Sequence, residues 1–328
     1  MQIISFVILI LIVLAIVSII AAYYLDKPFS KFEPRGKHIV ITGGSSGLGF
    51  SIAKLLVQQG ANVTIIARRL DLLEQAKTQL EKHADLSKTK ILTLSADVSK
   101  HQNIAAAISL AESEIGQSVD YIFTCAGYSR PGLFLDIEPF EFENGMKINY
   151  LGTVNAIRAA VQSMITKKRR GKIILISSTL GVMNLIGYSQ YSPTKHAIRS
   201  LAETLHQELQ PYQIDVHIYY VSTILTPGYL EEEKTKPAIT KIIEGTEISD
   251  ASPDARAKTL IDEGLTKNNH VITSDFVTDI FRIASKGVSV GYGFYDFVIS
   301  IFASIAIPCW RFFIQHQIRH HEKNEKVQ

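Results

Sequence analysis

The chain has 328 residues, and its 34 Lys and Arg side chains outnumber its 31 Asp and Glu side chains to give a formal charge of +3. This length fits one large domain with additional segments, and so small a surplus of positive charge gives no reason to expect a nucleic-acid partner. The mean hydropathy of +0.13 is high for a purely soluble enzyme and indicates contact with lipid. The two cysteines, Cys125 and Cys309, provide no disulfide framework and fit a reducing compartment.

The N-terminal segment predicts a membrane anchor. Residues 3–25 carry no charged side chain and could cross a hydrocarbon core of about 30 Å as one helix. A cleaved secretory signal is the alternative, but such signals begin with basic residues and have a shorter apolar core. We therefore predict a retained transmembrane anchor over residues 1–26. The basic residues that follow it place the next domain on the cytosolic side by the positive-inside rule: Lys27, Lys31, Arg35 and Lys37.

The middle of the chain alternates short β-branched runs with longer helical patterns, which predicts a Rossmann-type α/β domain with a doubly wound parallel sheet. Seven strands are expected, at 38–42, 63–67, 91–96, 121–124, 172–177, 215–221 and 270–273. Helices are expected at 47–59, 70–82, 103–115, 146–166 and 191–209. Most of the strands are too apolar to face water on one side, as in a sheet that helices cover on both faces.

An insert follows the sixth expected strand. Residues 227–250 are predicted to form a long mobile segment, in the position where ligand-covering lids often lie. The acidic run 231–233 within it fits a solvated loop, and attraction of a cationic substrate is the alternative.

The C-terminal part of the chain is apolar and then charged. Residues 287–313 are predicted to associate with a membrane, but Asp296 and Pro308 interrupt them, so a re-entrant or interfacial segment, a true span and a core helix all stay open. Residues 314–328 form a charged tail, in which two adjacent histidines lack partner ligands, so we expect no metal site.

A glycine-rich turn follows the first expected strand. Gly43, Gly47 and Gly49 let the backbone turn tightly and present N–H groups and a helix N-terminus to a pyrophosphate. The strand-turn-helix setting favours a dinucleotide site over a turn needed only for packing. The remaining expected contacts in this turn are Ser45, Ser46 and Leu48.

The end of the second expected strand predicts which dinucleotide binds. An acidic residue there would bind the ribose 2′-hydroxyl of NAD and repel a 2′-phosphate. This chain has Arg68 and Arg69 instead, and two guanidiniums can pair with the extra phosphate of NADP. NADPH is therefore the expected cofactor.

Ser178, Tyr191 and Lys195 form a candidate catalytic group. Residues four apart share one face of a helix, so the ammonium of Lys195 can lie beside the phenol of Tyr191 and stabilise its phenolate. Tyr191 would then donate a proton to a developing alkoxide, while Ser178 hydrogen-bonds the same oxygen. The spacing predicts carbonyl reduction with a nicotinamide cofactor.

Together these motifs resemble the short-chain dehydrogenase/reductase family over about residues 36–280. The resemblance implies that Asn149 holds a proton-relay water near Lys195, which also contacts the nicotinamide ribose. Its remaining implied cofactor contacts are Asp97 and Val98 at the adenine, Ala126 and Gly127 after the fourth strand, and Thr226 at the nicotinamide amide. The family's Asn-Asn-Ala-Gly motif reads Thr124-Cys125-Ala126-Gly127 here, and its Pro-Gly after the sixth strand reads Val221-Ser222.

Within this family, the stretches 187–195, 226–228 and 235–237 resemble the membrane-bound reductases of long-chain sphingoid ketones. That resemblance implies NADPH-dependent reduction of a 3-keto sphingoid base, with the catalytic domain on the cytosolic face of the endoplasmic reticulum membrane. The helices expected at 149–166 and 191–209 resemble those that pair in the family, which implies a homodimer or a homotetramer.

Two other functions compete with this one. A membrane-anchored reductase of a steroid, retinoid or fatty-acyl ketone would share the anchor, the basic strand end and the catalytic group. A non-catalytic membrane scaffold that senses NADP would not need Ser178, Tyr191 and Lys195 together.

Overall fold

The computed structural model describes residues 29–245 and 252–285, together with residues 6, 13, 295, 296, 298–303, 306, 309, 310 and 313. Nearly all of the anchor predicted at 1–26, much of the apolar segment at 287–313 and the tail at 314–328 lie outside these residues. Among the residues that are described, no helix has both the length and the apolar character needed to cross a bilayer.

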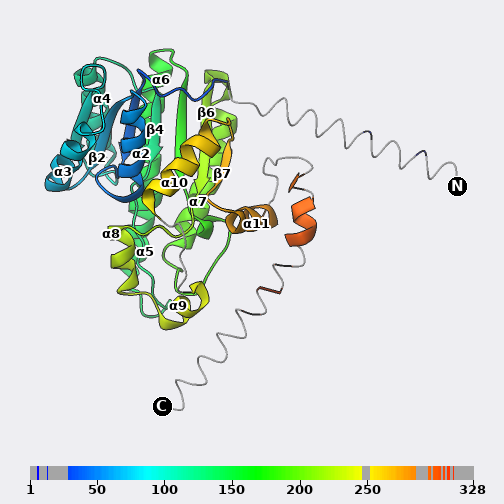
Figure 1. Ribbon diagram of the computed structural model, residues 1–328. Helices are drawn as coiled ribbons and strands as arrows, with labels where there is room; N and C mark the ends of the chain where they lie inside the picture. The colour runs from blue at the N-terminus through cyan, green and yellow to red at the C-terminus, as the bar shows by residue number, and fades with distance from the viewer. Residues whose placement is uncertain are drawn as a thin grey trace.

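One parallel sheet of seven strands organises the chain, in the order β3-β2-β1-β4-β5-β6-β7 (Figure 1). The strands are β1 (His38–Thr42), β2 (Asn62–Ala67), β3 (Ile91–Ser95), β4 (Tyr121–Thr124), β5 (Gly171–Ile176), β6 (Ile214–Tyr220) and β7 (Val271–Thr273). The strand order reverses between β1 and β4, and such a switch point opens a crevice at the carboxyl ends of the strands. The cofactor and catalytic residues predicted above lie at this edge.

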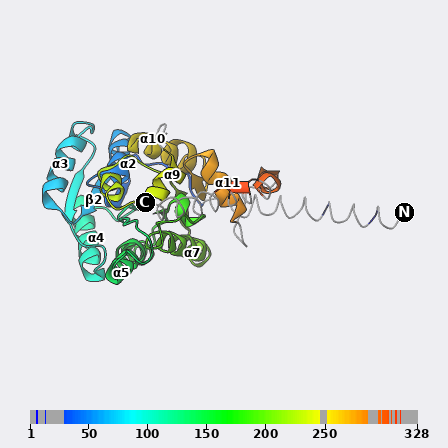
Figure 2. The ribbon, with the colours of Figure 1, turned by 90° about the horizontal axis from the view of Figure 1, so that it is seen from below.

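Helices cover both faces of the sheet, as the apolar strands predicted. On one face lie α2 (Gly47–Gln58), α3 (Leu70–Glu81) and α10 (Pro253–Lys258), whose buried side chains share one core with β1 and β2. On the other face α4 (His101–Ile115), α6 (Gly152–Thr166) and α7 (Ser192–Glu208) form a second core. Figure 2 separates α2 and α10 from α4 and α7 on opposite sides. The doubly wound fold is therefore confirmed.

The predicted elements differ from the observed ones in several places. The helix expected at 146–166 begins with a π-helical stretch, Met146–Leu151, before α6. The insert, predicted as a long mobile segment, contains α8 (Pro227–Glu233) and α9 (Ala238–Glu244). Thr226 begins α8 by accepting a hydrogen bond from the N–H of Tyr229 at 3.1 Å, and a proline at the first helical position fits that start. The sequence analysis also missed α5 (Pro139–Gly145), α10, the π-helical stretch Thr259–Leu265 and α11 (Phe276–Ala284).

The amino-terminal edge of the sheet contains a buried ion pair. Lys172 Nζ, on β5, lies 2.7 Å from Asp215 Oδ2 on β6 and donates to the Ser30 carbonyl oxygen at 2.6 Å. Asp215 also accepts a hydrogen bond from the Phe29 N–H at 2.8 Å. These bonds attach the chain that follows the predicted anchor to the centre of the sheet.

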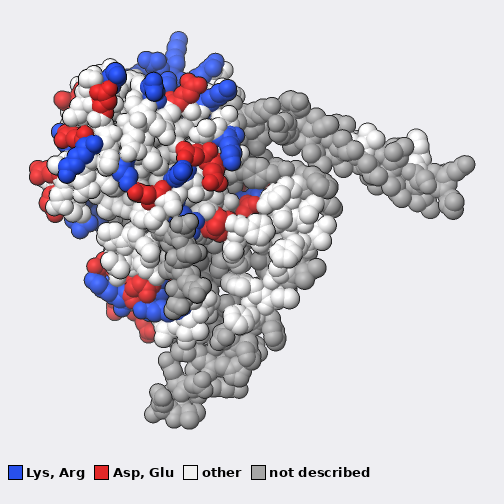
Figure 3. Space-filling view, in the orientation of Figure 1, with Lys and Arg blue, Asp and Glu red and all other residues white. Residues whose placement is uncertain are grey.

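Charges of both signs are spread over the surface of this domain. On the face shown in Figure 3, Lys and Arg side chains lie among Asp and Glu side chains instead of forming one continuous basic patch. This distribution agrees with the small net charge of the chain, +3.

Candidate active site

The glycine turn packs so closely that side chains would not fit. Gly43 has φ +68°, and a Cβ there would lie 2.7 Å from the backbone nitrogen of Ala126. A Cβ at Gly49 would collide with the carbonyl oxygen of Gly43. Gly47, at φ +57°, approaches Thr226, whose Cγ2 would be 3.0 Å from an added Cβ. The structure thus brings Ala126 and Thr226 to the turn, as the family resemblance implied.

This turn suits a dinucleotide pyrophosphate. Ser46 precedes α2 in extended conformation, and its side chain does not cap the helix. The first turn of α2 contains no acidic residue, so the free N–H groups of this turn face no carboxylate of the helix itself. Leu48 is buried in the core, so only its backbone could contact a cofactor, whereas Ser45 is half-buried.

The predicted adenine-end residues gather at the ends of β2 and β3. Arg68 and Arg69 are exposed, and in the described part of the chain neither forms an ion pair with a carboxylate. The Asp97 carboxylate accepts a hydrogen bond from the Ser99 N–H at 3.0 Å. Burial opposes ionisation of this carboxyl, but the hydrogen bonds from Ser99 and the positive charge of Arg68 outweigh it and hold the pKa of Asp97 below its usual value. Val98 is buried, so its backbone is the part that could contact adenine.

Ser178 lies two residues after the end of strand β5. Its hydroxyl accepts a hydrogen bond from the Leu180 N–H at 3.2 Å, which caps the short 3₁₀ turn Thr179–Gly181 and holds the side chain at the sheet edge. Ser178 is 9% exposed, so the hydroxyl works in a largely water-free setting.

Tyr191 and Lys195 lie at the start of α7, directly opposite this strand end. Lys195 Nζ donates to the Ile176 carbonyl oxygen at 2.9 Å and lies 5.5 Å from the centroid of the Tyr191 ring. Burial lowers the pKa of Lys195 to about 8. Burial and then the negative charge of Glu232 raise the pKa of Tyr191, while its hydrogen bond with Ser178 lowers it. The three predicted catalytic side chains therefore meet at one site.

Asn149 lies in the π-helical stretch before α6, a distortion that is frequent at functional sites. It is fully buried, accepts a hydrogen bond from the Tyr128 N–H at 2.9 Å and donates to the Tyr128 carbonyl oxygen at 2.9 Å. It also donates to Thr194 Oγ1 at 3.0 Å, one residue before Lys195. A Cβ at Gly127 would lie 3.1 Å from Asn149 Oδ1, so Gly127 also belongs to this part of the site.

The acidic run of the insert contains one exposed residue, Glu231, and two partly buried ones, Glu232 and Glu233. Glu231 is exposed and pairs with Lys234 at 2.7 Å, as a solvated loop would. Glu232 instead points inward and accepts a hydrogen bond from the Tyr188 hydroxyl at 2.6 Å. The interpretation of the whole run as a solvated loop is therefore wrong for Glu232, because successive residues of the helix α8 point in directions about 100° apart and so differ in exposure.

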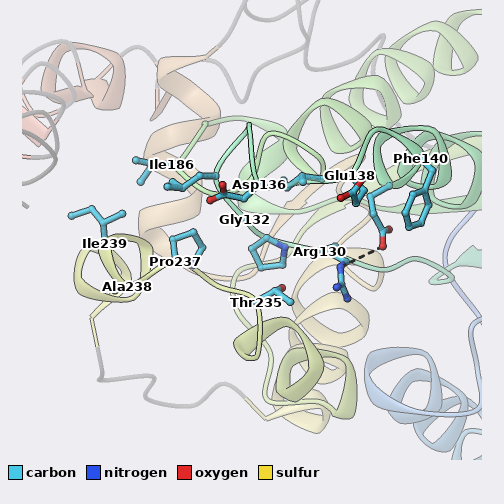
Figure 4. Close-up of a pocket in the computed structure, with 14 residues that line it drawn as sticks. Arg130, Gly132, Asp136, Glu138, Phe140, Ile186, Thr235, Pro237, Ala238 and Ile239 are labelled. Atoms are coloured by element: carbon cyan, nitrogen blue, oxygen red, sulfur yellow. Dashed lines mark ion pairs between the residues drawn. The ribbon is translucent and has the colours of Figure 1, made fainter. Parts of the chain in front are cut away.

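A cavity of about 450 Å³ lies between the loop after β4 and α9 (Figure 4). The lining includes Leu133, Ile137, Phe140, Ile186, Pro237 and Ile239. Arg130 and Glu141 form an ion pair at 3.3 Å beside it. The wall connects to the catalytic segment, because the Gly132 N–H donates to the Gly187 carbonyl oxygen at 2.9 Å, four residues before Tyr191.

Residues 37–237 match the family model described as short chain dehydrogenase. The chain belongs to the short-chain dehydrogenase family. It is 36% identical over 308 residues to 3-ketodihydrosphingosine reductase TSC10 of Cryptococcus neoformans, covering 92% of this chain and 91% of that one. It is 38% identical over 274 residues to 3-dehydrosphinganine reductase of Danio rerio, covering 82% and 81% of the two chains. With 3-ketodihydrosphingosine reductase of Mus musculus it shares 39% identity over 265 residues, or 79% of each chain.

Solved structures of this family have the same fold. Levodione reductase superposes with a TM-score of 0.65 at 21% identity, covering 74% of this chain and 96% of that one. A short-chain dehydrogenase/reductase from Burkholderia phymatum in complex with NAD gives a TM-score of 0.63 at 20% identity, covering 74% and 90%. These structures support the fold, and the family model and the relatives above confirm the predicted family membership.

Sequence reasoning missed several residues of this dehydrogenase site. Thr194 orients Asn149, and Tyr188 and Lys236 hold Glu232 and its neighbours. Only the position of Thr194 beside Lys195 could have been noticed in the sequence, because the other contacts join segments that are far apart along the chain.

Proposed function

We propose that this dehydrogenase reduces the 3-keto group of a long-chain sphingoid ketone, 3-ketodihydrosphingosine, with NADPH. The observation that carries the proposal is the convergence of Ser178, Tyr191 and Lys195 beside the glycine turn, in a chain that aligns along 92% of its length with a protein named 3-ketodihydrosphingosine reductase. Dihydrosphingosine is the expected product.

Three side chains would perform the protein's part of the chemistry. Tyr191 donates its phenolic proton to the ketone oxygen as that oxygen gains negative charge, and Ser178 donates a hydrogen bond to the same oxygen. Lys195, as an ammonium ion, stabilises the phenolate that remains on Tyr191. The bound nicotinamide supplies the hydride. The segment around Asn149 would hold the water through which the proton is replaced.

The choice of NADPH over NADH is part of this proposal. Arg68 and Arg69 end β2 with exposed guanidiniums, and no carboxylate stands at that position to bind a ribose hydroxyl. Charge-assisted hydrogen bonds to a phosphate are stronger than those between neutral groups, which supports a 2′-phosphate as the ligand.

A lipid substrate also fits the apolar surface beside the cavity. Leu133, Phe134 and Leu135 are 42%, 68% and 91% exposed at the edge of the loop that lines it. Burial of an alkyl chain gains about 0.8 kcal/mol per methylene, so an apolar path from bilayer to cavity would favour transfer of the substrate. We propose that the tail of the substrate occupies this cavity.

The location of the reaction is proposed from composition. The apolar segments at 1–26 and 287–313 support a membrane-bound enzyme, and the basic residues after the first segment support a cytosolic catalytic domain on the endoplasmic reticulum. Self-association through α6 and α7, as a homodimer or a homotetramer, is proposed from the family resemblance.

The test is oxidation of NADPH by the purified full chain in detergent, offered 3-ketodihydrosphingosine or a steroid ketone of matched concentration. We expect oxidation with the sphingoid ketone and none with Tyr191→Phe. Oxidation with the steroid alone would favour the competing reductase, and no oxidation with either ketone would favour a scaffold.

A further inference from the structure

Glu232 is a largely buried carboxylate in the last turn of α8, with 19% of its side chain exposed. Its best partner is the Tyr188 hydroxyl, at 2.6 Å from Oε1. The same hydroxyl lies 2.7 Å from Glu244 Oε1. A phenol has one proton to donate, so it can satisfy only one of these two carboxylates.

The cations near Glu232 are committed mainly to other carboxylates. Lys236, with 1% of its side chain exposed, forms a close ion pair with Glu233 and another with Glu244 at 2.7 Å, but its Nζ lies 3.6 Å from Glu232 Oε1. Lys241 pairs with Glu233 at 3.4 Å. Three carboxylates thus face two ammonium groups, and the longest ion-pair distance belongs to Glu232.

A buried hydroxyl beside Glu232 also lacks a hydrogen-bond partner among the described residues. Ser129 Oγ is buried and has no hydrogen-bond partner in the part of the chain that the structure describes. Burial raises the pKa of the Glu232 carboxyl above its usual value, and the nearby hydroxyls of Tyr188 and Ser129 lower it only in part. Buried polar atoms are normally paired and a hydroxyl oxygen can accept a hydrogen bond, so Ser129 Oγ is a second acceptor beside Glu232 that has no donor among the described residues.

The negative charge of Glu232 lies close to the catalytic Tyr191, where it opposes loss of the phenolic proton. The Tyr188 ring, which is bonded to Glu232, lies 6.3 Å from the Tyr191 ring. After burial, the charge of Glu232 is the main cause that raises the pKa of Tyr191. A nearby carboxylate that is only weakly paired makes it harder for a phenol to lose its proton. A cation that entered between Glu232 and Tyr191 with the substrate would remove this effect.

We propose that Glu232 binds the ammonium group of the substrate and thereby selects amino ketones over neutral lipid ketones. This inference rests on the proposed function. In a 2-amino-3-ketone the nitrogen is attached to the carbon next to the carbonyl, so a ketone oxygen held by Tyr191 and Ser178 carries its ammonium within a few bonds of the reacting centre. The ammonium group supplies the positive charge and the hydrogen-bond donors that the Glu232 carboxylate lacks.

The experiment compares two ketones of equal chain length, 3-ketodihydrosphingosine and the same molecule with hydrogen in place of the amino group. Glu232→Gln removes the charge and keeps the shape. Glu231→Gln is the matched control, because Glu231 is exposed and, among the described residues, pairs with Lys234 alone. Glu232→Asp tests whether a charged side chain restores preference, and thermal unfolding shows that each variant is folded.

We expect the original chain and Glu231→Gln to prefer the amino ketone, and Glu232→Gln to lose this preference by about tenfold or more in kcat/KM. The loss should be confined to the amino ketone, with activity on the neutral ketone unchanged or raised, and Glu232→Asp should recover part of the preference. Equal losses on both ketones, or an unchanged preference, would overturn the role of Glu232. Failure of the original chain to reduce the amino ketone would instead overturn the proposed function, and this inference with it.

Discussion

Lys195 Nζ lies 5.5 Å from the centre of the Tyr191 ring and is held there by the Ile176 carbonyl oxygen at 2.9 Å. The bond to the strand end holds the ammonium beside the phenol. This pair is the basis of the first two predictions.

Removing the phenolic hydroxyl should stop catalysis without removing the cofactor. We expect Tyr191→Phe to lower kcat by about 10²- to 10⁴-fold, because general acid catalysis contributes that much. Binding of NADPH, measured by its fluorescence, should stay within about twofold, since the substitution leaves the glycine turn intact. A variant that retains most of its kcat would show that another group donates the proton.

The pH dependence of kcat/KM should report Lys195. Its pKa is lowered to about 8 by burial, so the ammonium loses its proton as the pH rises through about 8, and reduction should slow over that range. Lys195→Arg keeps its charge at these pH values. The decline should therefore disappear in Lys195→Arg, even if its overall rate is lower. An identical decline in both proteins would assign it to a different group.

The glycine turn should not tolerate a methyl group. In Gly49→Ala the new Cβ would meet the Gly43 carbonyl oxygen, which is backbone and cannot move away alone. We expect the affinity for NADPH to fall by about tenfold or more, together with a lower melting temperature. Gly228→Ala is the control, because its Cβ would lie 3.6 Å from Thr226 Oγ1, an ordinary contact. Similar cofactor affinity in both variants would contradict the close approach.

Replacing the two arginines after β2 should change cofactor preference. We expect Arg68→Ala with Arg69→Ala to weaken NADPH binding by roughly tenfold to hundredfold, because bonds to a charged phosphate are lost. The affinity for NADH should be unchanged, since it lacks the 2′-phosphate. Arg170→Ala, an exposed arginine before β5, provides the control. Equal weakening for both cofactors would indicate a general loss of structure.

The buried ion pair at the far edge of the sheet should matter for stability. We expect Lys172→Met to lower the free energy of unfolding by about 3–5 kcal/mol, because the substitution leaves the Asp215 carboxylate buried without its cation. Lys88→Met breaks an exposed pair with Asp85, with 80% and 56% of the two side chains accessible, and should cost less than about 1 kcal/mol. Urea unfolding measures both values, and equal costs would contradict the role of burial.

Much of the fold follows from local patterns. The strands at 38–42 and 121–124 have the bounds predicted from their apolar runs; β2, β3 and β7 differ from their predicted bounds by one residue at one end, and β5 and β6 by one residue at both ends. The π-helical stretch Met146–Leu151 could not be predicted, because its residues have an ordinary helical pattern and only the packing of Asn149 against Tyr128 and Thr194 distinguishes it. The insert at 227–250 was predicted as a long mobile segment, but it contains two helices, and ion pairs around Lys236 connect them.

The sequence by itself determined the alternating α/β pattern, the glycine turn, the basic end of the second strand and the spacing of Tyr191 and Lys195. These are local features, because the period of a helix or strand decides which side chains share a face. Only the tertiary structure decided that Glu232 is buried beside Tyr188, which is 44 residues away. It also decided that Thr226 approaches Gly47, and that Lys236 is shared among three carboxylates. Such contacts depend on how distant segments pack, and packing leaves no periodic signal along the chain.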